Sequence, residues 1–398
     1  MIAENGMIRV NPLPAPTWRW LRINDTELQL PEDVTEALVE TELPADASEE
    51  TGSLQASADA SGADEMPAVS ADASETGMQT FTEEEYDRIR EMETGMGRDF
   101  ADYMMTAPVD PFLWKAGEAE KTEEPLVFRI FNTGLESSAN RFFFSAEKDS
   151  EFTVVQYLSK DDARDMTESG DAPVYSFVDT RVLVAEGAKV HLIQIADSAP
   201  EMCSCFDVGA CVAEGGSFDI LQIGMDGRSS FFGAAADLAG ANAHFAVETA
   251  YRVGAGQHVD MNYVARHRGV NTECEMDIKG VLTDGASKSC RATIDFIRGC
   301  KGAKGDERED VLLLGEDIVN KTIPLILCQE EDVEGAHGAT IGDLSEEILG
   351  YFRSRGIDDE LAYRLMATGR LLGSIEKVPV KSLRDVLMTE LGEEIEDE

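Results

Sequence analysis

The sequence of 398 residues predicts a mainly β protein, with a strand-rich core and helical segments on both sides of it. Three observations lead to this fold class. Between Leu126 and about Thr340, apolar and polar residues alternate with a period of two, which is typical of strands. Short turns of small residues recur between these runs. Residues 81–106 and 343–398 instead repeat their apolar positions with the period of a helix.

The turns of the strand-rich region repeat a small-residue motif. Turns that contain Gly and Ala stand at residues 187–188, 240–241, 254–256, 285–286 and 302–303, and a Gly-Gly turn stands at 215–216. A turn that recurs at a similar place suits a β-solenoid, in which successive coils stack on one another. The alternation alone fits a β-sandwich as well, so the pattern leaves both folds open. A stack of coils has open edges at its ends, which we expect the flanking helical segments to cover.

We divide the chain into three regions, which are residues 1–125, 126–342 and 343–398. The first is an N-terminal helical region with an insertion at 44–78. This insertion is acidic and rich in Ala and Ser, with almost no large apolar side chains. It cannot offset the entropy of ordering, and we expect it to be disordered. The second region is the β core, and the third is a C-terminal helical domain.

Helices are expected in both flanking regions. Residues 81–106 are predicted to be helical, because a capping box precedes an apolar stripe there. In the C-terminal region, a first helix should run over about 345–355, and Asp358 should cap a second. A run rich in proline and tryptophan at 13–21 precedes all of these, and we interpret it as a docking strap without chemistry.

The composition excludes several classes of partner. The formal net charge is −44, with 78 acidic against 34 basic residues. Phosphate backbones and anionic lipids attract clustered Lys and Arg, so we expect no nucleic-acid partner and no membrane partner. We find no apolar run long enough to span a bilayer and no N-terminal signal segment, and we therefore expect a cytoplasmic protein. The sequence has no Gly-x-x-x-x-Gly-Lys-Ser/Thr loop, so the chain should bind no ATP itself.

Seven cysteines are spread along the chain, and this odd number does not suggest a disulfide framework. Cys203, Cys205 and Cys211 form a cluster, but their spacing is not that of a common zinc site. In a strand, Cys203 and Cys205 would share a face. We interpret these cysteines as buried structural thiols, because free Cys is among the most buried residue types.

A candidate metal centre lies at His258, Asp260 and His267. In a strand, His258 and Asp260 share a face, and two imidazoles with one carboxylate form a ligand set for a divalent metal. These residues would support a metal-dependent β-fold enzyme. The competing interpretation, which we favour, is that His258 and Asp260 bond to each other and hold neighbouring coils together.

The junction between the strands and the C-terminal helices carries the most specific motif. It reads Glu-Gly-Ala-His-Gly-Ala-Thr-Ile-Gly over 334–342, and Tyr-Phe-Arg-Ser-Arg-Gly-Ile follows over 351–357. A His-Gly-Ala-Thr element before a helix that ends in Arg-Ser-Arg-Gly-Ile resembles the SufB/SufD family of iron–sulfur cluster assembly proteins. The resemblance extends from about Leu126 to Arg370. It implies a right-handed parallel β-helix core, flanked by N-terminal and C-terminal helical segments.

The resemblance also implies roles for single residues. His337 matches the histidine that is implicated in building the nascent cluster in SufD-type subunits, and imidazole can ligate iron. Glu309 stands where SufB-type subunits carry a cysteine. A carboxylate cannot accept sulfane sulfur, so the chain resembles SufD more than SufB. Cys328 is a further ligand candidate, although we favour a buried thiol at that position.

From the resemblance we expect a non-enzymatic scaffold subunit of a Suf-type complex. It would pair with a SufB-like paralogue, or with a second copy of itself as a homodimer, through the end of the β-helix near 300–340. It would dock a SufC-type ATPase through the C-terminal helices, with Tyr351, Phe352 and Arg355 among the contacts. A transient iron–sulfur cluster would form at the subunit interface. The alternatives are the metal-dependent enzyme and a purely structural assembly module in which His337 is inert.

Overall fold

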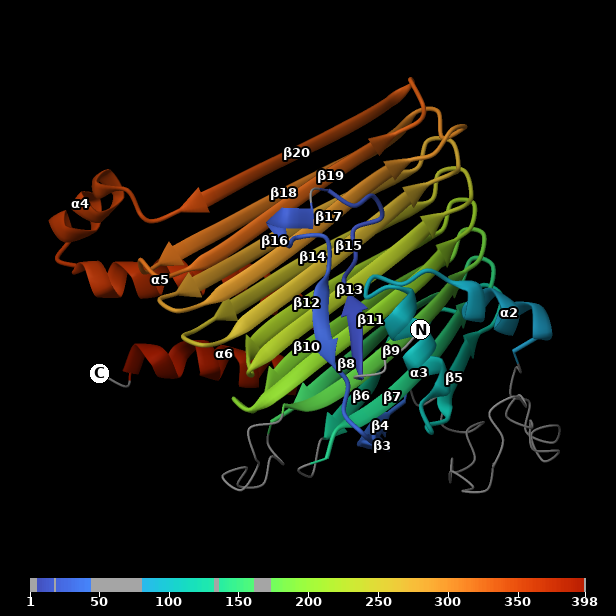
Figure 1. Cartoon of the computed structure of the whole chain (residues 1–398), viewed down its shortest axis with the longest axis horizontal. Helices are drawn as coiled ribbons and strands as arrows, with labels where there is room; N and C mark the ends of the chain where they lie inside the picture. The colour runs from blue at the N-terminus through green and yellow to red at the C-terminus, as the bar shows by residue number, and fades with distance from the viewer. Residues whose placement is uncertain (1–5, 18, 44–80, 132–135, 161–172, 397–398) are drawn as a thin grey trace.

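The computed structural model describes residues 6–17, 19–43, 81–131, 136–160 and 173–396. The insertion predicted at 44–78 lies outside these residues. The described part of the chain forms a long stack of strands with five α-helices on its flanks (Figure 1). The prediction of a mainly β fold with helical segments before and after the core is therefore confirmed.

The strands lie in two large sheets, which we name by the numbering of their strands. The even-strand sheet contains β4 (Leu38–Glu42), β6 (Leu126–Phe131), β8 (Glu151–Ser159), β10 (Lys189–Ser198), β12 (Ser217–Asp226), β14 (His244–Val253), β16 (Glu273–Thr283), β18 (Ala303–Leu314) and β20 (Val333–Gly342). The odd-strand sheet contains β3 (Thr35–Glu36), β5 (Pro111–Ala116), β7 (Ser138–Ala146), β9 (Val174–Val184), β11 (Met202–Val212), β13 (Ser229–Leu238), β15 (His258–His267), β17 (Ser287–Phe296) and β19 (Val319–Cys328).

The connectivity is that of a parallel β-solenoid. From β6 onward, consecutive strands alternate between the two sheets, and each strand pairs in parallel with the strand two positions later, as β10 does with β12 and β11 does with β13. The chain makes about seven turns in this way. Parallel pairing throughout the stack decides against the antiparallel sandwich that the sequence pattern left open.

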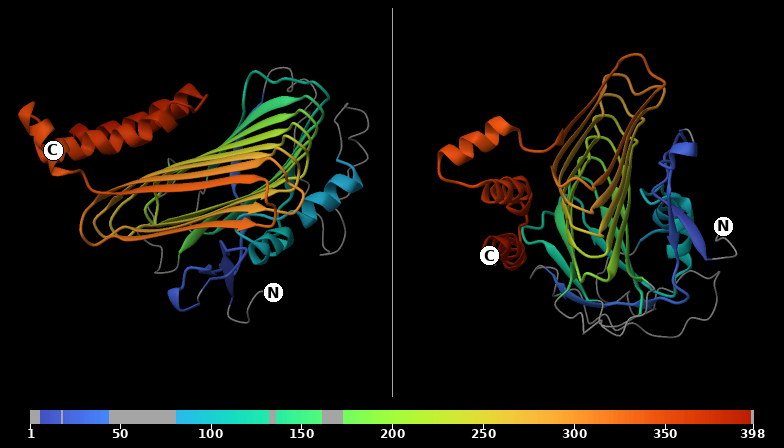
Figure 2. Two further views of the ribbon diagram at one scale, coloured as in Figure 1. Left: turned by 90° about the horizontal axis from the view of Figure 1, so that it is seen from above. Right: turned by 60° about the vertical axis from the view of Figure 1, so that its left-hand side comes forward.

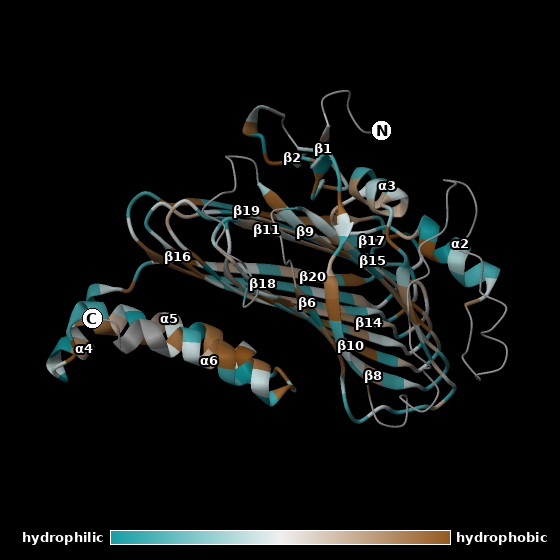
Figure 3. Cartoon of the chain, turned by 90° about the horizontal axis from the view of Figure 1, so that it is seen from below, coloured by the Kyte–Doolittle hydropathy of each residue, from teal (hydrophilic) through white to brown (hydrophobic). Residues whose placement is uncertain are grey.

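The solenoid interior is filled by the alternate side chains that point inward from both sheets. Hydrophilic and hydrophobic residues alternate along many of the strands (Figure 3). Because successive coils are in register, like residues stack on one another. The rings of Phe206 and Phe232 lie 5.8 Å apart in the odd-strand sheet, and those of Phe218 and Phe245 lie 6.0 Å apart in the even-strand sheet.

A ladder of buried amides crosses this apolar interior. Gln194 Nε2 donates to Gln156 Oε1 at 2.8 Å, and Gln222 Nε2 donates to Gln194 Oε1 at 2.8 Å. The Tyr263 hydroxyl donates to Gln222 Oε1 at 2.7 Å from the opposite sheet. All three glutamines are fully buried. A slip of one residue between coils would leave these groups unpaired in the interior, so the ladder helps to fix the register.

The two ends of the stack differ. At the first end, β4 pairs antiparallel with β6, and β3 and β5 both pair with β7, so strands from the N-terminal region close this edge. At the last end, β19 and β20 are the outermost strands of their sheets. The expectation that helical segments cover the ends is therefore wrong. An added strand can pair with the backbone N–H and C=O groups of an edge strand, whereas a helix cannot.

The C-terminal helices lie against the even-strand sheet. They are α4 (Glu346–Ser354), α5 (Asp359–Ile375) and α6 (Lys381–Glu396); Asp358 caps α5 as predicted, and Ser345 caps α4. Leu371 and Ile375 of α5 and Leu387 of α6 belong to one apolar cluster with side chains on the outer face of that sheet. Figure 2 shows these helices on one side of the solenoid and the N-terminal segment on the other.

The N-terminal region covers the outer face of the odd-strand sheet. It contains β1 (Met7–Val10), the 3-10 helix η1 (Arg19–Leu21), β2 (Thr26–Gln29), α2 (Glu83–Glu91) and α3 (Arg98–Thr106). The segment predicted to be helical over 81–106 therefore contains two helices, and residues 92–97 between them are not helical. Gly95 N donates to the backbone of β11, Met96 N donates to Asp207 Oδ1 at 2.8 Å, and Gly97 takes φ +87°, so contacts with the sheet break the helix.

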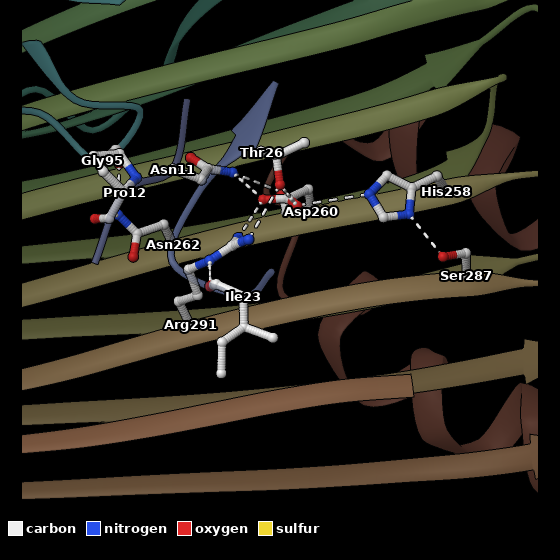
Figure 4. Close-up of polar contacts among 10 residues, drawn as sticks. All are labelled: Asn11, Pro12, Ile23, Thr26, Gly95, His258, Asp260, Asn262, Ser287 and Arg291. Carbon is white, nitrogen blue, oxygen red and sulfur yellow. Dashed lines mark hydrogen bonds and ion pairs between the residues drawn. The ribbon is translucent and has the colours of Figure 1, made fainter. Parts of the chain in front are cut away.

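A buried polar cluster holds this N-terminal segment to the solenoid (Figure 4). Asp260 on β15 is fully buried, and its carboxylate accepts hydrogen bonds from Asn11 Nδ2 at 2.6 Å and from Thr26 Oγ1 at 2.5 Å. Arg291 Nη1 on β17 donates to Asp260 at 2.7 Å, and Arg291 Nε donates to the carbonyl of Ile23 at 2.8 Å. Segments more than 230 residues apart in sequence are thus joined by one carboxylate.

We expect Asp260→Ala to release the N-terminal segment. The change leaves the Arg291 guanidinium buried without its anion, and breaking a buried pair costs about 3–5 kcal/mol. Unfolding in denaturant measures this loss, and hydrogen exchange over 7–29 reports detachment. Asp219→Ala is the matched control, because that carboxylate is 33% exposed on the other sheet and its loss should cost less than about 1 kcal/mol. Equal exchange in the two variants would contradict the role of Asp260.

Candidate functional site

The candidate site lies at the last end of the solenoid, on the inner faces of β18 and β20. Burial alternates along β18, and its inward positions include Glu307 and Glu309, which are 4% and 2% exposed. Their register partners on β20 are His337 and Ala339. Side chains of paired residues in parallel strands point to the same face. His337 therefore stands above Glu307 on the inner face of the edge strand, where it is exposed to solvent.

A lysine from the opposite sheet neutralises this acidic end. Lys288 on β17 is fully buried, and its ammonium group forms an ion pair with Glu309. Lys288 Nζ also donates to Thr322 Oγ1 on β19 at 2.9 Å. Burying two charges is tolerated only where they are paired and hydrogen-bonded. The three residues come from three strands, β17, β18 and β19, and form a polar cluster inside the last end of the solenoid.

Glu307 experiences a different environment from Glu309. Burial, together with the charge of the neighbouring Glu309, raises the pKa of Glu307 to about 7, although Lys288 opposes this shift. Glu307 therefore exists in both protonation states near neutral pH. The edge strand thus presents an imidazole, with the Glu307 carboxyl group beneath it on the neighbouring strand.

Cys328 does not join this group. It is the last residue of β19, it is exposed, and its thiol donates to the Glu330 carbonyl at 3.0 Å. The interpretation of Cys328 as a buried thiol is therefore wrong, because no further coil covers that position. His337 lies four residues beyond the first residue of β20, which corresponds to about 13 Å of strand after the turn that follows Cys328.

The candidate metal set at β15 is not assembled. His258 Nε2 lies 3.6 Å from Asp260 Oδ2, but Asp260 is already engaged by the N-terminal segment. His267 points to the opposite face, into the interior, where its ring lies 4.9 Å from that of Phe296. Burial lowers the pKa of His267 to about 4, so it is neutral at physiological pH. Within the described ranges, no three His, Cys, Asp or Glu residues are arranged to hold a metal ion.

The favoured structural interpretation of His258 and Asp260 agrees with their contacts. His258 Nδ1 lies 3.1 Å from Ser287 Oγ on the next coil. Burial alone would raise the pKa of Asp260, but hydrogen bonds from His258 and Thr26 and the charge of Arg291 hold it below its usual range. The two residues therefore hold neighbouring coils together, as expected. The contact of Asp260 with the N-terminal segment was not expected, because it depends on a fold that brings distant residues together.

Sequence reasoning missed Lys288 and Glu307. Strict alternation over residues 303–311 places Glu307 on the same face as Val311, so a charge at an inward position was an available signal. Lys288 carried no comparable signal, because its partner is 21 residues away on the other sheet.

A further pair of contacts, from His191 Nδ1 and His244 Nε2 to Asp219 at 3.1 and 3.5 Å, lies on the outer face of the even-strand sheet.

The residues expected to contact an ATPase lie on and just after α4. Tyr351 is 56% exposed, and the guanidinium of Arg355 lies 4.9 Å from the centre of its ring. Phe352 is partly buried in an apolar cluster with Leu349 and Ala362, which attaches α4 to α5. Tyr351 and Arg355 are therefore available at the surface, whereas Phe352 mainly positions the helix.

The remaining cysteines agree with a structural role where they are buried. Cys203 and Cys205 share the outer face of β11 and pack beneath α3 in one apolar cluster. Burial raises the pKa of the Cys203 thiol to about 11, so it stays protonated at neutral pH. Cys211 is only partly buried and accepts a hydrogen bond from Arg88 Nη2 at 3.1 Å.

Across the described residues, the helices include none that is long and apolar enough to cross a bilayer.

Comparison with known proteins gives a consistent match. The family model described as SUF system FeS cluster assembly, SufBD core domain, matches residues 128–370. An iron–sulfur cluster assembly SufBD family protein of Staphylococcus saprophyticus is 25% identical over 219 residues, which cover 54% of this chain and 47% of the relative. The iron–sulfur cluster assembly protein SufD of Bacillus subtilis is 29% identical over 139 residues, which cover 34% of this chain and 32% of the relative.

The SufB protein of Bacillus subtilis matches almost as well, at 27% identity over 128 residues, which cover 32% of this chain and 28% of that protein. The matched part therefore spans about half the length of these relatives or less. The identities to SufD and to SufB are too similar to separate the two types. The family model, however, extends from β6 to α5 and covers more than half of the chain. The chain therefore belongs to the SufB/SufD family of iron–sulfur cluster assembly proteins.

Proposed function

We propose that the chain is a scaffold subunit of a Suf-type iron–sulfur cluster assembly complex, and that it takes the SufD role. The difference between the two solenoid ends supports this most strongly. Strands from the N-terminal region close one end, whereas β19 and β20 leave the other end uncovered and carry His337. An open strand edge that bears a metal-ligand side chain suits an interface at which two subunits share a nascent cluster.

The edge of β20 is the proposed site of pairing. The strand is ten residues long, mostly exposed, and carries one charged residue, Glu334. Isolated edges are usually protected by Lys, by Pro or by short length, and β19 has both Lys321 and Pro324. Without such protection, β20 is suited to accept a strand from another subunit. The proposed partner is a SufB-like paralogue, and a second copy of this chain is the alternative.

The side chains at this end suit a partial ligand set for the cluster, which is the substrate of assembly. His337 offers an imidazole, which is a good ligand for iron. Glu309 is held by Lys288 and cannot replace a thiolate, so the sulfur-accepting cysteine must come from the partner subunit. The proposed SufD role rests on this carboxylate. The partner then supplies sulfur chemistry, and this chain supplies an iron ligand and a rigid surface.

Docking of a SufC-type ATPase to the C-terminal helices completes the proposal. Ile348, Tyr351 and Leu365 expose 40%, 56% and 41% of their surfaces on α4 and α5. Exposed apolar and aromatic side chains on a helical pair are typical of protein contacts. ATP binding and hydrolysis would occur on the partner, and movement of these helices would then reach the solenoid through the apolar cluster that joins α5 to the even-strand sheet.

Two other functions are less well supported. A metal-dependent enzyme at His258, Asp260 and His267 would need side chains that converge, and His267 faces away from the other two. A purely structural assembly module with an inert His337 fits the fold equally well. It differs from the proposed function only in what a change at His337 would do.

We expect His337→Ala to lower cluster formation strongly without preventing subunit assembly. The side chain is exposed and contributes nothing to the core, so its loss should affect only ligation. Anaerobic reconstitution of the full complex, followed by its absorption spectrum, should show at least about a tenfold lower yield of cluster. His191→Ala, a histidine on the outer face, is the matched control. A normal yield from His337→Ala would favour the purely structural module.

We expect Gly338→Lys to weaken pairing with the partner subunit. A Cβ at Gly338 meets nothing within 4 Å, so the change fits the isolated chain. A lysine on an edge strand opposes addition of another strand, and the dissociation constant should rise by about tenfold. Analytical ultracentrifugation or interferometry with the SufB-type protein of the same genome measures this, with Thr106→Lys on α3 as the matched control. Unchanged affinity would exclude β20 as the pairing edge.

We expect the purified, unchanged chain to hydrolyse no ATP. We expect a double variant, with Tyr351 and Arg355 both changed to Ala, to bind the SufC-type ATPase more weakly. Aromatic and arginine side chains dominate many interfaces, and their truncation should weaken binding by about tenfold or more. Calorimetric titration of the ATPase into the chain measures the effect. Met388→Ala, an exposed change on α6, is the control. Equal losses in the control and in the double variant would argue against contact through α4.

A further inference from the structure

An exposed aromatic tip projects from the N-terminal segment. Trp20 on η1 is 74% exposed and Leu21 is 38% exposed, and Trp20 is the most exposed large apolar side chain among the residues described. Arg22, which follows, is also exposed, in a chain whose net charge is −44. Tryptophan and arginine are the residue types most enriched in binding hot spots. Large apolar side chains held in solvent usually mark a contact surface.

Hydrogen bonds join the two arms of the loop that carries this tip. Leu13 N donates to the Asn24 carbonyl at 2.7 Å and closes the base of the loop. Thr17 N and Thr17 Oγ1 donate to Asn24 Oδ1 at 2.7 and 2.8 Å, so the amide side chain ties the two arms together. Pro14 and Pro16 further restrict the backbone. A surface that is ordered before binding loses little conformational entropy when a partner binds.

The base of the loop is fixed next to the open end of the solenoid. Asn262 Nδ2 on β15 donates to the Pro12 carbonyl at 3.2 Å, and Arg291 Nε on β17 donates to the Ile23 carbonyl at 2.8 Å. One strand, β19, separates β17 from the edge of its sheet. Strands lie about 4.8 Å apart. Trp20 is three residues from Ile23, which allows a reach of about 10 Å, or two strands.

The figures agree with this placement. In Figure 1 the blue N-terminal segment crosses the stack from the β3 and β4 end to the level of β17. The same segment that closes the first end of the solenoid therefore reaches the coil beneath the last end. The loop that carries η1 is anchored on the odd-strand sheet, one strand below its edge strand β19, and the proposed pairing strand β20 is the edge of the even-strand sheet in the same last coil.

We propose that Trp20 and Leu21 form a second contact for the subunit that pairs with β20, so that its binding surface extends from the β20 edge onto the N-terminal loop. This inference rests on the proposed pairing. The partner surface would be an apolar pocket with an acidic rim, because an indole and an aliphatic side chain are flanked by an exposed arginine. Two contacts on different sheets would also fix the rotation of one subunit relative to the other, which a single strand pairing does not.

Fluorescence of the full chain tests the contact directly. In a variant with Trp18→Phe and Trp114→Phe, Trp20 is the single tryptophan. Addition of the SufB-type protein of the same genome, with its own tryptophans replaced by phenylalanine, should shift the Trp20 emission to shorter wavelength as the indole leaves water. Phosphatidylcholine vesicles with phosphatidylglycerol serve as the comparison. A shift with vesicles and none with the protein would overturn the inference in favour of a lipid surface.

The affinity of Trp20→Ala for the same protein provides the second measurement. We expect the dissociation constant to rise by about 30-fold, which is typical of a tryptophan hot spot. Leu38→Ala, an exposed change on β4 at the closed end, is the matched control and should leave the affinity unchanged. If Gly338→Lys prevents binding while Trp20→Ala binds as tightly as the unchanged chain, the proposed pairing stands and this inference fails. If neither change affects binding, both fail.

Discussion

Backbone groups in a stacked solenoid are paired within the protein only where another strand lies beside them. Each coil between β6 and β18 has a neighbour on both sides, and the N-terminal strands β3, β4 and β5 provide one for the first coil. The last coil has no such neighbour, so β20 presents ten residues of strand edge to solvent. Water satisfies these groups in the free chain, and a strand from another protein satisfies them as well. This unfinished edge decides where the candidate site lies and what can cover it.

The interior changes character as it approaches that edge. Most inward positions are apolar, and the buried glutamine ladder is neutral and fully paired. In the last coils, Lys288, Glu307 and Glu309 occupy inward positions instead. Hydrophobic residues of similar volume would stabilise the solenoid at least as well, because a buried ion pair gains little over its desolvation cost. The charges of these three residues suit an inner face that meets a polar partner or substrate rather than another coil.

Much of this arrangement was readable from the sequence, and the exceptions share a cause. Period-two alternation and recurrent turns predicted the strands, and capping residues predicted α4 and α5, because these signals are local. The alternation did not decide between a solenoid and a sandwich, which depends on strand pairing. The break between α2 and α3, the contacts of Asp260 with the N-terminal segment and the pairing of Lys288 with Glu309 were missed or misassigned. Each depends on residues that are far apart in sequence.

The misassigned metal set shows how such a residue can still matter for function. Asp260 belongs to no assembled metal site among the described residues, but it binds Asn11 and Thr26 to β15, which lies two strands from the edge strand β19. Because these bonds are buried and charge-assisted, the N-terminal segment has one position along the stack rather than a range of them. The two ends of the loop that follows Asn11 are therefore anchored to β15 and β17, the latter one strand below β19. A partner that contacts both surfaces would meet two elements of one rigid body, and the carboxylate of Asp260 would act on assembly through position alone.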